Sequence, residues 1–243
     1  MIKTDYKIEI NDELTKNVFL MQLSGNTGAV KAPGQFINIA IDGLYLRRPI
    51  SVCDWGDGWM DIIYKVVGKG TEQMSKMPHG TKLNVLSGLG NGFDTGKCAK
   101  RTAVIGGGVG IPPLFGLAKQ LLAEGKSVTA VLGFNRDDEI FLADAFAAIG
   151  CETVVTTLDG SFGVEGLVTD ALPGLHFDYF CACGPEAMLR AVYEATETSG
   201  QMSFEERMGC GFGACMGCSC RTKYGNKRIC KEGPVLEKEE IIW

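Results

Sequence analysis

Four cysteines near the carboxyl end of the chain have a spacing that suits iron–sulfur chemistry. Cys210, Cys215 and Cys218 follow the pattern C-x4-C-x2-C, and Cys230 lies downstream. This order is typical of the thiolate ligands of a plant-type [2Fe–2S] cluster. Two irons need four converging sulfurs, and the glycines between these cysteines permit the tight turns that such a loop requires. Because this type of cluster carries one electron at a time, the pattern predicts electron transfer.

Structural zinc and disulfide bonds are the other common uses of clustered cysteines. Zinc sites usually pair their cysteines as C-x2-C, and the four-residue gap after Cys210 departs from that spacing. A disulfide scaffold is typical of short secreted chains, whereas this chain has 243 residues and ample apolar content. Cys220 is expected to be a spectator beside the cluster, with a ligand exchange as the alternative. The remaining cysteines are expected to be buried free thiols: Cys53, Cys98, Cys151, Cys181 and Cys183.

Composition excludes several classes of protein. The net charge of −5 and the lack of a basic run argue against a nucleic-acid surface. No apolar run reaches membrane-spanning length, and the first residues lack the apolar core of a signal peptide. We therefore expect a cytoplasmic protein that binds neither nucleic acid nor membrane.

Residues 1–97 alternate apolar and polar residues in short runs separated by turn signals such as Asp42-Gly43. Six short strands in fewer than a hundred residues predict a small antiparallel β-barrel. A short helix is expected at Thr71–Met77. The predicted strands are Tyr6–Ile10, Val18–Leu23, Gln35–Ile41, Ile50–Cys53, Met60–Val67 and Lys82–Leu86.

Residues 98–200 change to alternating strands and helices, which predicts a doubly wound parallel α/β domain. Residues 201–243 are too few for a core of their own and are expected to form a small [2Fe–2S] module organised by the cluster. The predicted strands of the middle domain are Arg101–Ile105, Ser127–Gly133, Glu152–Leu158 and Phe177–Ala182. Its predicted helices are Pro112–Ala123, Ile140–Ile149 and Pro185–Thr198.

Two glycine turns follow strands of this middle domain. Gly106–Gly110 leads into a helix, where backbone amides can approach a pyrophosphate. Its spacing differs from G-x-G-x-x-G, so alone it also fits simple tight packing. The second turn, Cys183-Gly184-Pro185, ends the last strand. Two such turns at strand ends of one sheet predict a nucleotide site.

The barrel contains the run Arg47-Arg48-Pro49-Ile50-Ser51 at the start of a strand. A guanidinium suits bidentate phosphate binding, and a serine hydroxyl can bond a flavin ring edge. Alone, the run would be read as a surface arginine pair.

Together these motifs resemble the ferredoxin–NAD(P) reductase superfamily over the whole chain. The segments Glu205–Cys210 and Cys230–Pro234 narrow the resemblance to the electron-transfer subunits of class 1B, NAD-dependent dihydroorotate dehydrogenases. This resemblance implies FAD in the barrel and NAD in the second domain. It also implies that the cluster faces a separate FMN-containing catalytic subunit, in a heterotetramer of two plus two chains.

The resemblance assigns roles position by position, and Glu206 and Arg207 stay unassigned, with a surface ion pair as the default. The implied FAD contacts are Arg48, Pro49, Ile50, Ser51, Ile63, Tyr64, Lys65, Gly70 and Thr71. The implied nicotinamide contacts are Gly106, Gly107, Gly108, Val109, Gly110, Cys183, Gly184 and Pro185. The implied cluster ligands are Cys210, Cys215, Cys218 and Cys230.

Cofactor preference depends on the loop after the second parallel strand. There Arg136 is followed by Asp137, Asp138 and Glu139. A 2′-phosphate requires a basic pocket, so three acids disfavour NADP and predict NAD.

The implied function is transfer of electrons from dihydroorotate, through the partner's FMN, the cluster and FAD, to NAD⁺ in pyrimidine (UMP) biosynthesis. FAD can exchange one or two electrons, which joins a one-electron cluster to a hydride acceptor. The three modules leave no room for a catalytic barrel of about 250 residues. His79 and His176 lack suitable partners and resemble no catalytic base, so a partner subunit is required.

Two alternatives share some of these features. One is the small FAD/[2Fe–2S] subunit of an NADH-dependent ferredoxin:NADP⁺ reductase or a sulfide dehydrogenase. The other is a redox sensor without turnover, which the two nucleotide turns disfavour. The partner interface is expected around the cluster, where Phe212, Met216 and nearby residues should form an apolar contact patch.

Overall fold

The structure, a computed structural model, describes all 243 residues. Its first part is a closed antiparallel barrel with the strand order β1-β2-β5-β4-β3-β6, as predicted. The strands are β1 (Ile2–Thr15), β2 (Val18–Ser24), β3 (Phe36–Ile39), β4 (Arg48–Gly56), β5 (Trp59–Lys65) and β6 (Lys82–Leu89). Alternate residues fill the barrel interior, among them Ile8, Met21 and Ile62, which are fully buried. The short helix α1 (Lys69–Ser75) follows β5 and begins before the predicted Thr71.

The second part is a seven-stranded sheet with the order β10-β9-β8-β7-β11-β12-β15. Every neighbouring pair is parallel except β12 and β15. The strands are β7 (Arg101–Gly107), β8 (Ser127–Phe134), β9 (Glu152–Thr157), β10 (Val164–Glu165), β11 (Tyr179–Cys183), β12 (Gly200–Ser203) and β15 (Val235–Glu237). The helices are α2 (Pro112–Ala123), α3 (Ala143–Ala148), α4 (Val168–Ala171) and α5 (Glu186–Ala195). Single 3-10 turns lie at Thr95–Lys97, Gly108–Gly110, Asp137–Glu139, Leu172–Gly174 and Lys238–Glu240.

Neighbouring residues of β7 serve two different cores. Val104 packs with residues of α2 and α3 on one face of the sheet. Ile105 packs with residues of α4 and α5 on the other face. The sheet is therefore covered by helices on both faces, as the predicted doubly wound domain requires.

Two predicted helices are shorter in the structure. The helix predicted over Ile140–Ile149 begins only at Ala143, because Leu142 adopts a left-handed φ of 62° that a helix cannot include. The helix predicted over Pro185–Thr198 ends at Ala195, where Thr196 turns to an extended conformation. Its hydroxyl donates to the carbonyl of Val192, one of the last helical carbonyls.

The carboxyl-terminal residues are tied to the large sheet. They form a hairpin of β13 (Ser219–Thr222) and β14 (Gly225–Arg228), and then β15 pairs with β12. Cys218 and Cys230 share a core with α5. Besides the cluster that is expected to organise residues 201–243, β15 and this core also hold them. The exact domain limits stay a prediction, and the limit at residue 200 falls inside β12.

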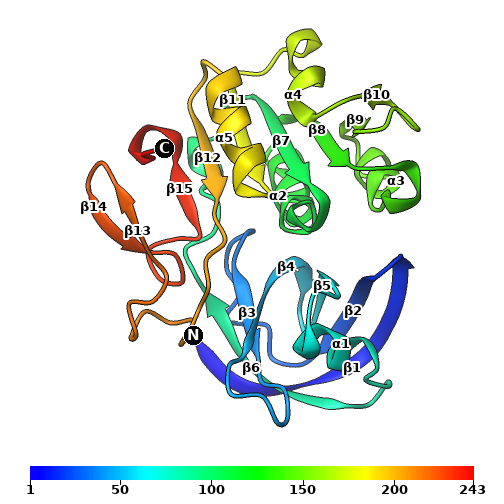
Figure 1. Cartoon of the computed structure of the whole chain (residues 1–243), viewed down its shortest axis with the longest axis vertical. Coiled ribbons are helices and arrows are strands. Elements are labelled where there is room, and N and C mark those ends of the chain that lie inside the picture. Colours follow the sequence, from blue (N-terminus) through cyan, green and yellow to red (C-terminus); the bar gives the residue numbers. More distant parts are fainter.

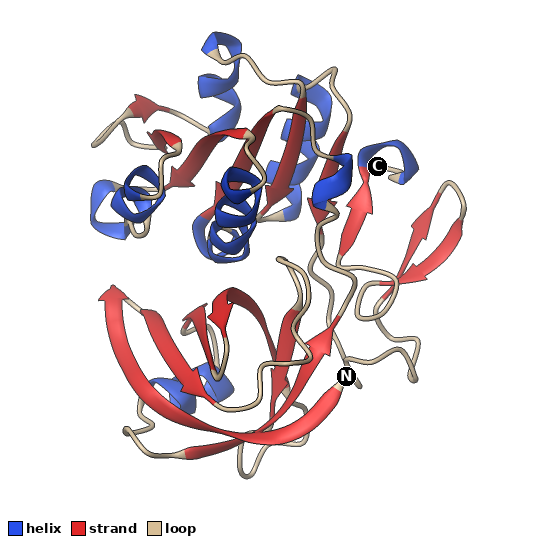
Figure 2. Cartoon of the chain, turned by 180° about the vertical axis from the view of Figure 1, so that it is seen from behind, coloured by secondary structure: helices blue, strands red, loops and turns tan.

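The three parts pack closely together (Figure 1 and, from behind, Figure 2). Helix α2 lies against β4 of the barrel, where a Cβ on Gly116 would stand 2.8 Å from the Cys53 carbonyl oxygen. Lys119 of α2 forms an ion pair of 2.5 Å with Asp54 of β4. None of the helices combines the length and hydrophobicity that a transmembrane segment needs.

Candidate redox site

A cavity of about 320 Å³ lies where the barrel meets the segment that leads from β12 to the cysteine loop. Its walls include Phe36 of β3, Phe204 and Pro234. Apolar walls with an arginine at one side fit a flavin nucleotide. All the predicted FAD contacts except Gly70 line it: Arg48, Pro49, Ile50, Ser51, Ile63, Tyr64, Lys65 and Thr71.

Gly70 lies directly behind Arg48. A Cβ on Gly70 would stand 2.1 Å from Arg48 Nε, so only glycine lets the guanidinium lie against the start of α1. The next residue, Thr71, accepts hydrogen bonds from the N–H groups of Val67 and Gly68 at 3.0 and 3.3 Å. The structure thus brings Arg48 together with Gly70 and Thr71, and the contacts of all three with FAD stay a prediction.

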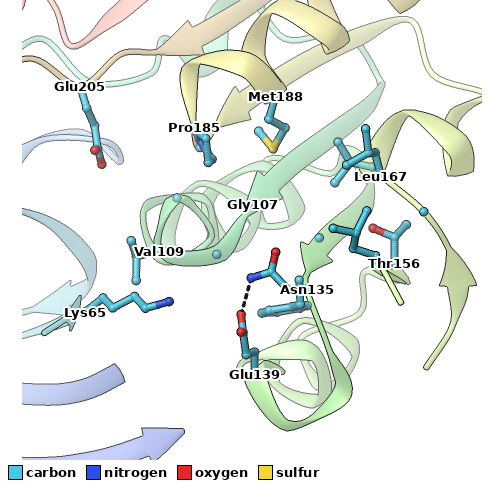
Figure 3. Close-up of a pocket in the computed structure, with 18 residues that line it drawn as sticks. Lys65, Gly107, Val109, Asn135, Glu139, Thr156, Leu167, Pro185, Met188 and Glu205 are labelled. Atoms are coloured by element: carbon cyan, nitrogen blue, oxygen red, sulfur yellow. Dashed lines mark hydrogen bonds between the residues drawn. The ribbon is translucent and has the colours of Figure 1, made fainter. Parts of the chain in front are cut away.

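A second cavity, of about 460 Å³, lies at the carboxyl ends of β7, β8 and β11 (Figure 3). Gly107, Gly108, Val109, Gly110, Gly184 and Pro185 line it, as the nicotinamide prediction requires. Two predicted contacts lie elsewhere. Gly106 is packed under Ile111 and Leu114, and Cys183 lines the first cavity. The contacts of Gly106 and Cys183 with a nicotinamide nucleotide stay a prediction.

The two glycine turns touch each other. A Cβ on Gly110 would stand 2.4 Å from the carbonyl oxygen of Cys183, so the close approach of these turns depends on glycine. Burial raises the pKa of the Cys183 thiol to about 12, so this thiol is neutral where it lines the first cavity.

Lys65, Val109 and Glu205 line both cavities and so mark the junction between them. In Figure 3, Lys65 extends from a strand of the barrel at the lower left, and Glu205 lies at the upper left, with Val109 between them. Sequence reasoning missed Glu205, because a lone acid beside the cysteine motif carries no spacing signal. The carboxylate is accessible from the open cavity, yet protein surrounds most of it, and this desolvation raises its pKa.

Arg136, the one cation of the loop after β8, is flanked by acids. Its Nε lies 3.6 Å from a carboxylate oxygen of Asp138 and 3.8 Å from one of Asp159. Glu139 accepts a 2.8 Å hydrogen bond from Asn135 within the second cavity (Figure 3). Sequence reasoning missed Asp159, which comes from the separate loop after β9. The observed charges fit the predicted preference against a 2′-phosphate.

The four cluster cysteines lie in two pairs. The Cys210 N–H points at Cys215 Sγ at 3.4 Å, and the Cys215 N–H points at Cys210 Sγ at 3.4 Å. The Cys230 N–H points at Cys218 Sγ, also at 3.4 Å. No three His, Cys, Asp or Glu side chains converge closely enough for a single metal ion. Two pairs instead suit a binuclear cluster, in which each iron takes two protein sulfurs.

The two pairs have different surroundings. Cys218 and Cys230 are 2% exposed, and burial raises the pKa of Cys230 to about 12. Cys215 is exposed and Cys210 half-buried. Desolvation acts to raise the pKa of Cys210, but hydrogen bonds from backbone N–H groups and from Cys215 outweigh it and lower the pKa to about 6. N–H groups aimed at thiolates are what a cluster loop needs.

The cysteine loop also contacts the wall of the first cavity. Asn38 of β3 is 1% exposed, and its Nδ2 donates to the carbonyl of Cys210 at 3.4 Å. Two residues earlier on the same strand face, Phe36 lines the cavity. A Cβ on Gly211 would stand 2.3 Å from the Asn38 amide nitrogen, so the loop passes close to the barrel. The first cavity therefore lies between the second cavity and the cysteine loop.

Other sequence expectations have mixed outcomes. As expected, five cysteines are buried free thiols: Cys53, Cys98, Cys151, Cys181 and Cys183. His79 Nε2 lies 3.0 Å from a carboxylate oxygen of Glu9 on the exposed barrel surface, and neither residue lines either cavity. Glu206 lines the first cavity rather than pairing with Arg207.

Comparisons with known proteins agree with this geometry. A family described as the iron–sulfur cluster binding domain of dihydroorotate dehydrogenase B matches residues 205–242. The chain is 42% identical to the dihydroorotate dehydrogenase B (NAD(+)) electron transfer subunit of Fusobacterium nucleatum, over 98% of this chain and 97% of that one. It belongs to this family of electron transfer subunits. The subunit of the same name from Geobacillus sp. is 40% identical over 94% of each chain.

Solved structures show the same architecture. The structure of an NADH-dependent reduced ferredoxin–NADP oxidoreductase superposes with a TM-score of 0.90 and 30% identity, over 98% of this chain and 90% of that one. A ferredoxin NADP⁺ reductase from Neisseria gonorrhoeae, with bound FAD and NADP, gives a TM-score of 0.69 over 79% of this chain and 89% of that one. Its identity of 18% supports a shared fold alone.

Proposed function

We propose that this chain is the electron-transfer subunit of a dihydroorotate dehydrogenase B and passes electrons to NAD⁺ in pyrimidine biosynthesis. Its cofactors are FAD, a [2Fe–2S] cluster and NAD. The observation that carries this proposal is the linear arrangement of three sites. The FAD cavity joins the nicotinamide cavity through Lys65, Val109 and Glu205, and meets the cysteine loop through Phe36 and Asn38.

Each site supplies part of the transfer. We assign Arg48, which lies against Gly70, to the FAD phosphates, and Pro49, Ile50 and Tyr64, which line the same cavity, to the flavin ring. Bound flavin supplies the exchange between one-electron and two-electron chemistry. The glycine turns at β7 and β11 open the backbone to the dinucleotide. Cys210, Cys215, Cys218 and Cys230 hold the two irons.

We further propose that the partner is an FMN-containing catalytic subunit in a heterotetramer of two plus two chains. Electrons must cross where the cluster approaches the surface, which is the side of Cys210 and Cys215. On this loop Phe212 is 44% exposed and Met216 is 55% exposed. Two large apolar side chains beside an accessible redox centre favour a protein contact at this position.

The test is to purify the tagged chain anaerobically with whatever binds it and to assay dihydroorotate-dependent reduction of NAD⁺. We expect activity, with both FMN and FAD released from the complex. NADP⁺ should support a much lower rate, because Asp138 and Asp159 already flank Arg136. A complex that oxidises NADH but never responds to dihydroorotate would refute the proposal.

One second candidate has an observation in its favour. The 30% identity to the NADH-dependent reduced ferredoxin–NADP oxidoreductase extends over nearly the whole chain. A subunit of that kind would hold the same cofactors and differ in its partner. Ferredoxin-dependent activity of the purified complex, with no FMN, would support this candidate instead.

A further inference from the structure

One peptide group of the cysteine loop is bonded at both ends. The Gly213 carbonyl accepts a 2.6 Å hydrogen bond from Nη1 of Arg228. The N–H of the same peptide group, which belongs to Ala214, points at Cys210 Sγ at 3.2 Å. A guanidinium and a ligand sulfur are therefore joined through a single peptide dipole.

Arg228 is held in place by a second set of bonds. Its Nε donates to Glu232 at 2.9 Å, and its Nη2 forms an ion pair with the other carboxylate oxygen. The backbone N–H of Arg228 also donates to Glu232, at 2.9 Å. The two side chains are 22% and 35% exposed, so the fork is partly shielded from water. Neither residue lines the FAD or nicotinamide cavity.

We propose that Arg228 is a positioning residue that sets the reduction potential of the cluster through the Gly213–Ala214 peptide. Potentials of such clusters depend on net charge and on hydrogen bonds to the sulfurs. A cation on the carbonyl polarises the peptide, which strengthens the N–H bond to Cys210 Sγ. The inference rests on the proposed cluster at the four cysteines.

The sign of the effect follows from charge. Reduction adds one negative charge to the centre, so a nearby cation favours the reduced form and a nearby carboxylate opposes it. Arg228→Gln should therefore lower the potential. Glu232→Gln removes the counter-charge of the guanidinium and should raise the potential. Opposite shifts from two residues in one ion pair distinguish this role from a general loosening of the loop.

The experiment is an EPR-monitored redox titration of the cluster in the complete complex. For Arg228→Gln we expect the equilibrium constant for reduction to fall about tenfold, which is about 59 mV for one electron. The FAD potential should stay unchanged. Arg221→Gln is the matched control, because it removes the same charge from the same hairpin at an exposed position. Arg228→Lys, which keeps the charge, should recover much of the shift.

The outcomes separate the alternatives. Equal shifts of the reduction potential in Arg228→Gln and Arg221→Gln would show only a long-range charge effect and would overturn the proposal. An Arg228→Gln variant that keeps its cluster at the wild-type potential would also overturn it. If Arg228→Gln loses its cluster, the potentials of Glu232→Gln and Arg228→Lys test the proposal in its place. An unchanged or lowered potential in Glu232→Gln then overturns the proposal. A wild-type complex without a [2Fe–2S] signal would instead refute the cluster assignment itself.

Discussion

The dinucleotide cleft and the cysteine loop are built in opposite ways. The cleft, which comprises the FAD and nicotinamide cavities, is lined mainly by residues of strands and of the turns and helices next to them. The segment from Gly209 to Gly217 contains no helix or strand. It is positioned by side chains from outside the segment, notably Asn38 and Arg228.

The cleft and the cysteine loop therefore differ in what stabilises them: packing of the folded chain in the cleft, and metal binding in the loop. A cleft between packed elements is stabilised by the same apolar burial that stabilises the domains. A loop of thiols and N–H groups gains its main stabilisation when ligand bonds form, so metal binding there contributes folding free energy. Loss of the cluster should thus affect the loop and spare the cleft.

The largest expected effect comes from Cys215→Ser. Removing one exposed ligand should abolish the [2Fe–2S] EPR signal, because the Cys210–Cys215 pair then has one sulfur. FAD content and NADH-driven flavin reduction should persist. Cys220→Ser is the control, because Cys220 is a nearby thiol outside the two pairs. If the Cys220 variant also loses the cluster, the ligand set is wrong.

Gly110→Ala should have the opposite pattern, with an effect on the cleft and none on the cluster. The added methyl would meet the Cys183 carbonyl at 2.4 Å, and such overpacking costs about 1–3 kcal/mol. We expect NADH-driven flavin reduction to slow at least tenfold (about 1.4 kcal/mol in the barrier) with the cluster signal retained. Stopped-flow spectroscopy measures this rate. Gly174→Ala, which meets no atom within 4 Å, should be neutral; equal effects would place the defect outside the cleft.

Met216→Glu tests the outer surface of the loop. A charge on this exposed side chain should weaken association with the catalytic subunit, about tenfold or more in Kd, by desolvation at the interface. NADH-driven flavin reduction should be unchanged. Leu14→Glu, at an exposed position near the end of β1, serves as the control. Unaltered co-purification of the Met216 variant would count against this interface.

The smallest effect is expected at the boundary between the two regions. Asn38→Ala removes one buried hydrogen bond to the loop, worth about 1 kcal/mol. The cluster absorbance should disappear at a lower temperature on heating, while FAD release is unchanged. Simultaneous loss of both cofactors at a lowered temperature would show that the two regions unfold as one unit.

Much of this architecture was predictable from local patterns. The period-two runs in residues 1–97 predicted all six barrel strands, and Pro112–Ala123 is a helix with the predicted limits. Several of these segments carry a periodic signal, because strands such as β2 bury alternate residues in the barrel interior. The cysteine spacing likewise identified the cluster loop, since ligand order is a property of the chain alone.

Other features depended on contacts between distant segments. The short strands β12 and β15 lack a periodic signal and exist because they pair with each other and with β11. Asp159 beside Arg136, Glu205 between the cavities and Arg228 on the Gly213 carbonyl each join separate parts of the chain.

The sequence by itself determined the order of the modules and the redox chemistry and predicted the cluster ligands, because these depend on residue types at short spacing. Only the tertiary structure decided which polar side chains surround the cavities and the cysteine loop. Hydrogen bonds and charge pairs act over a few ångströms in space, and residues far apart in the chain come that close only in the folded protein.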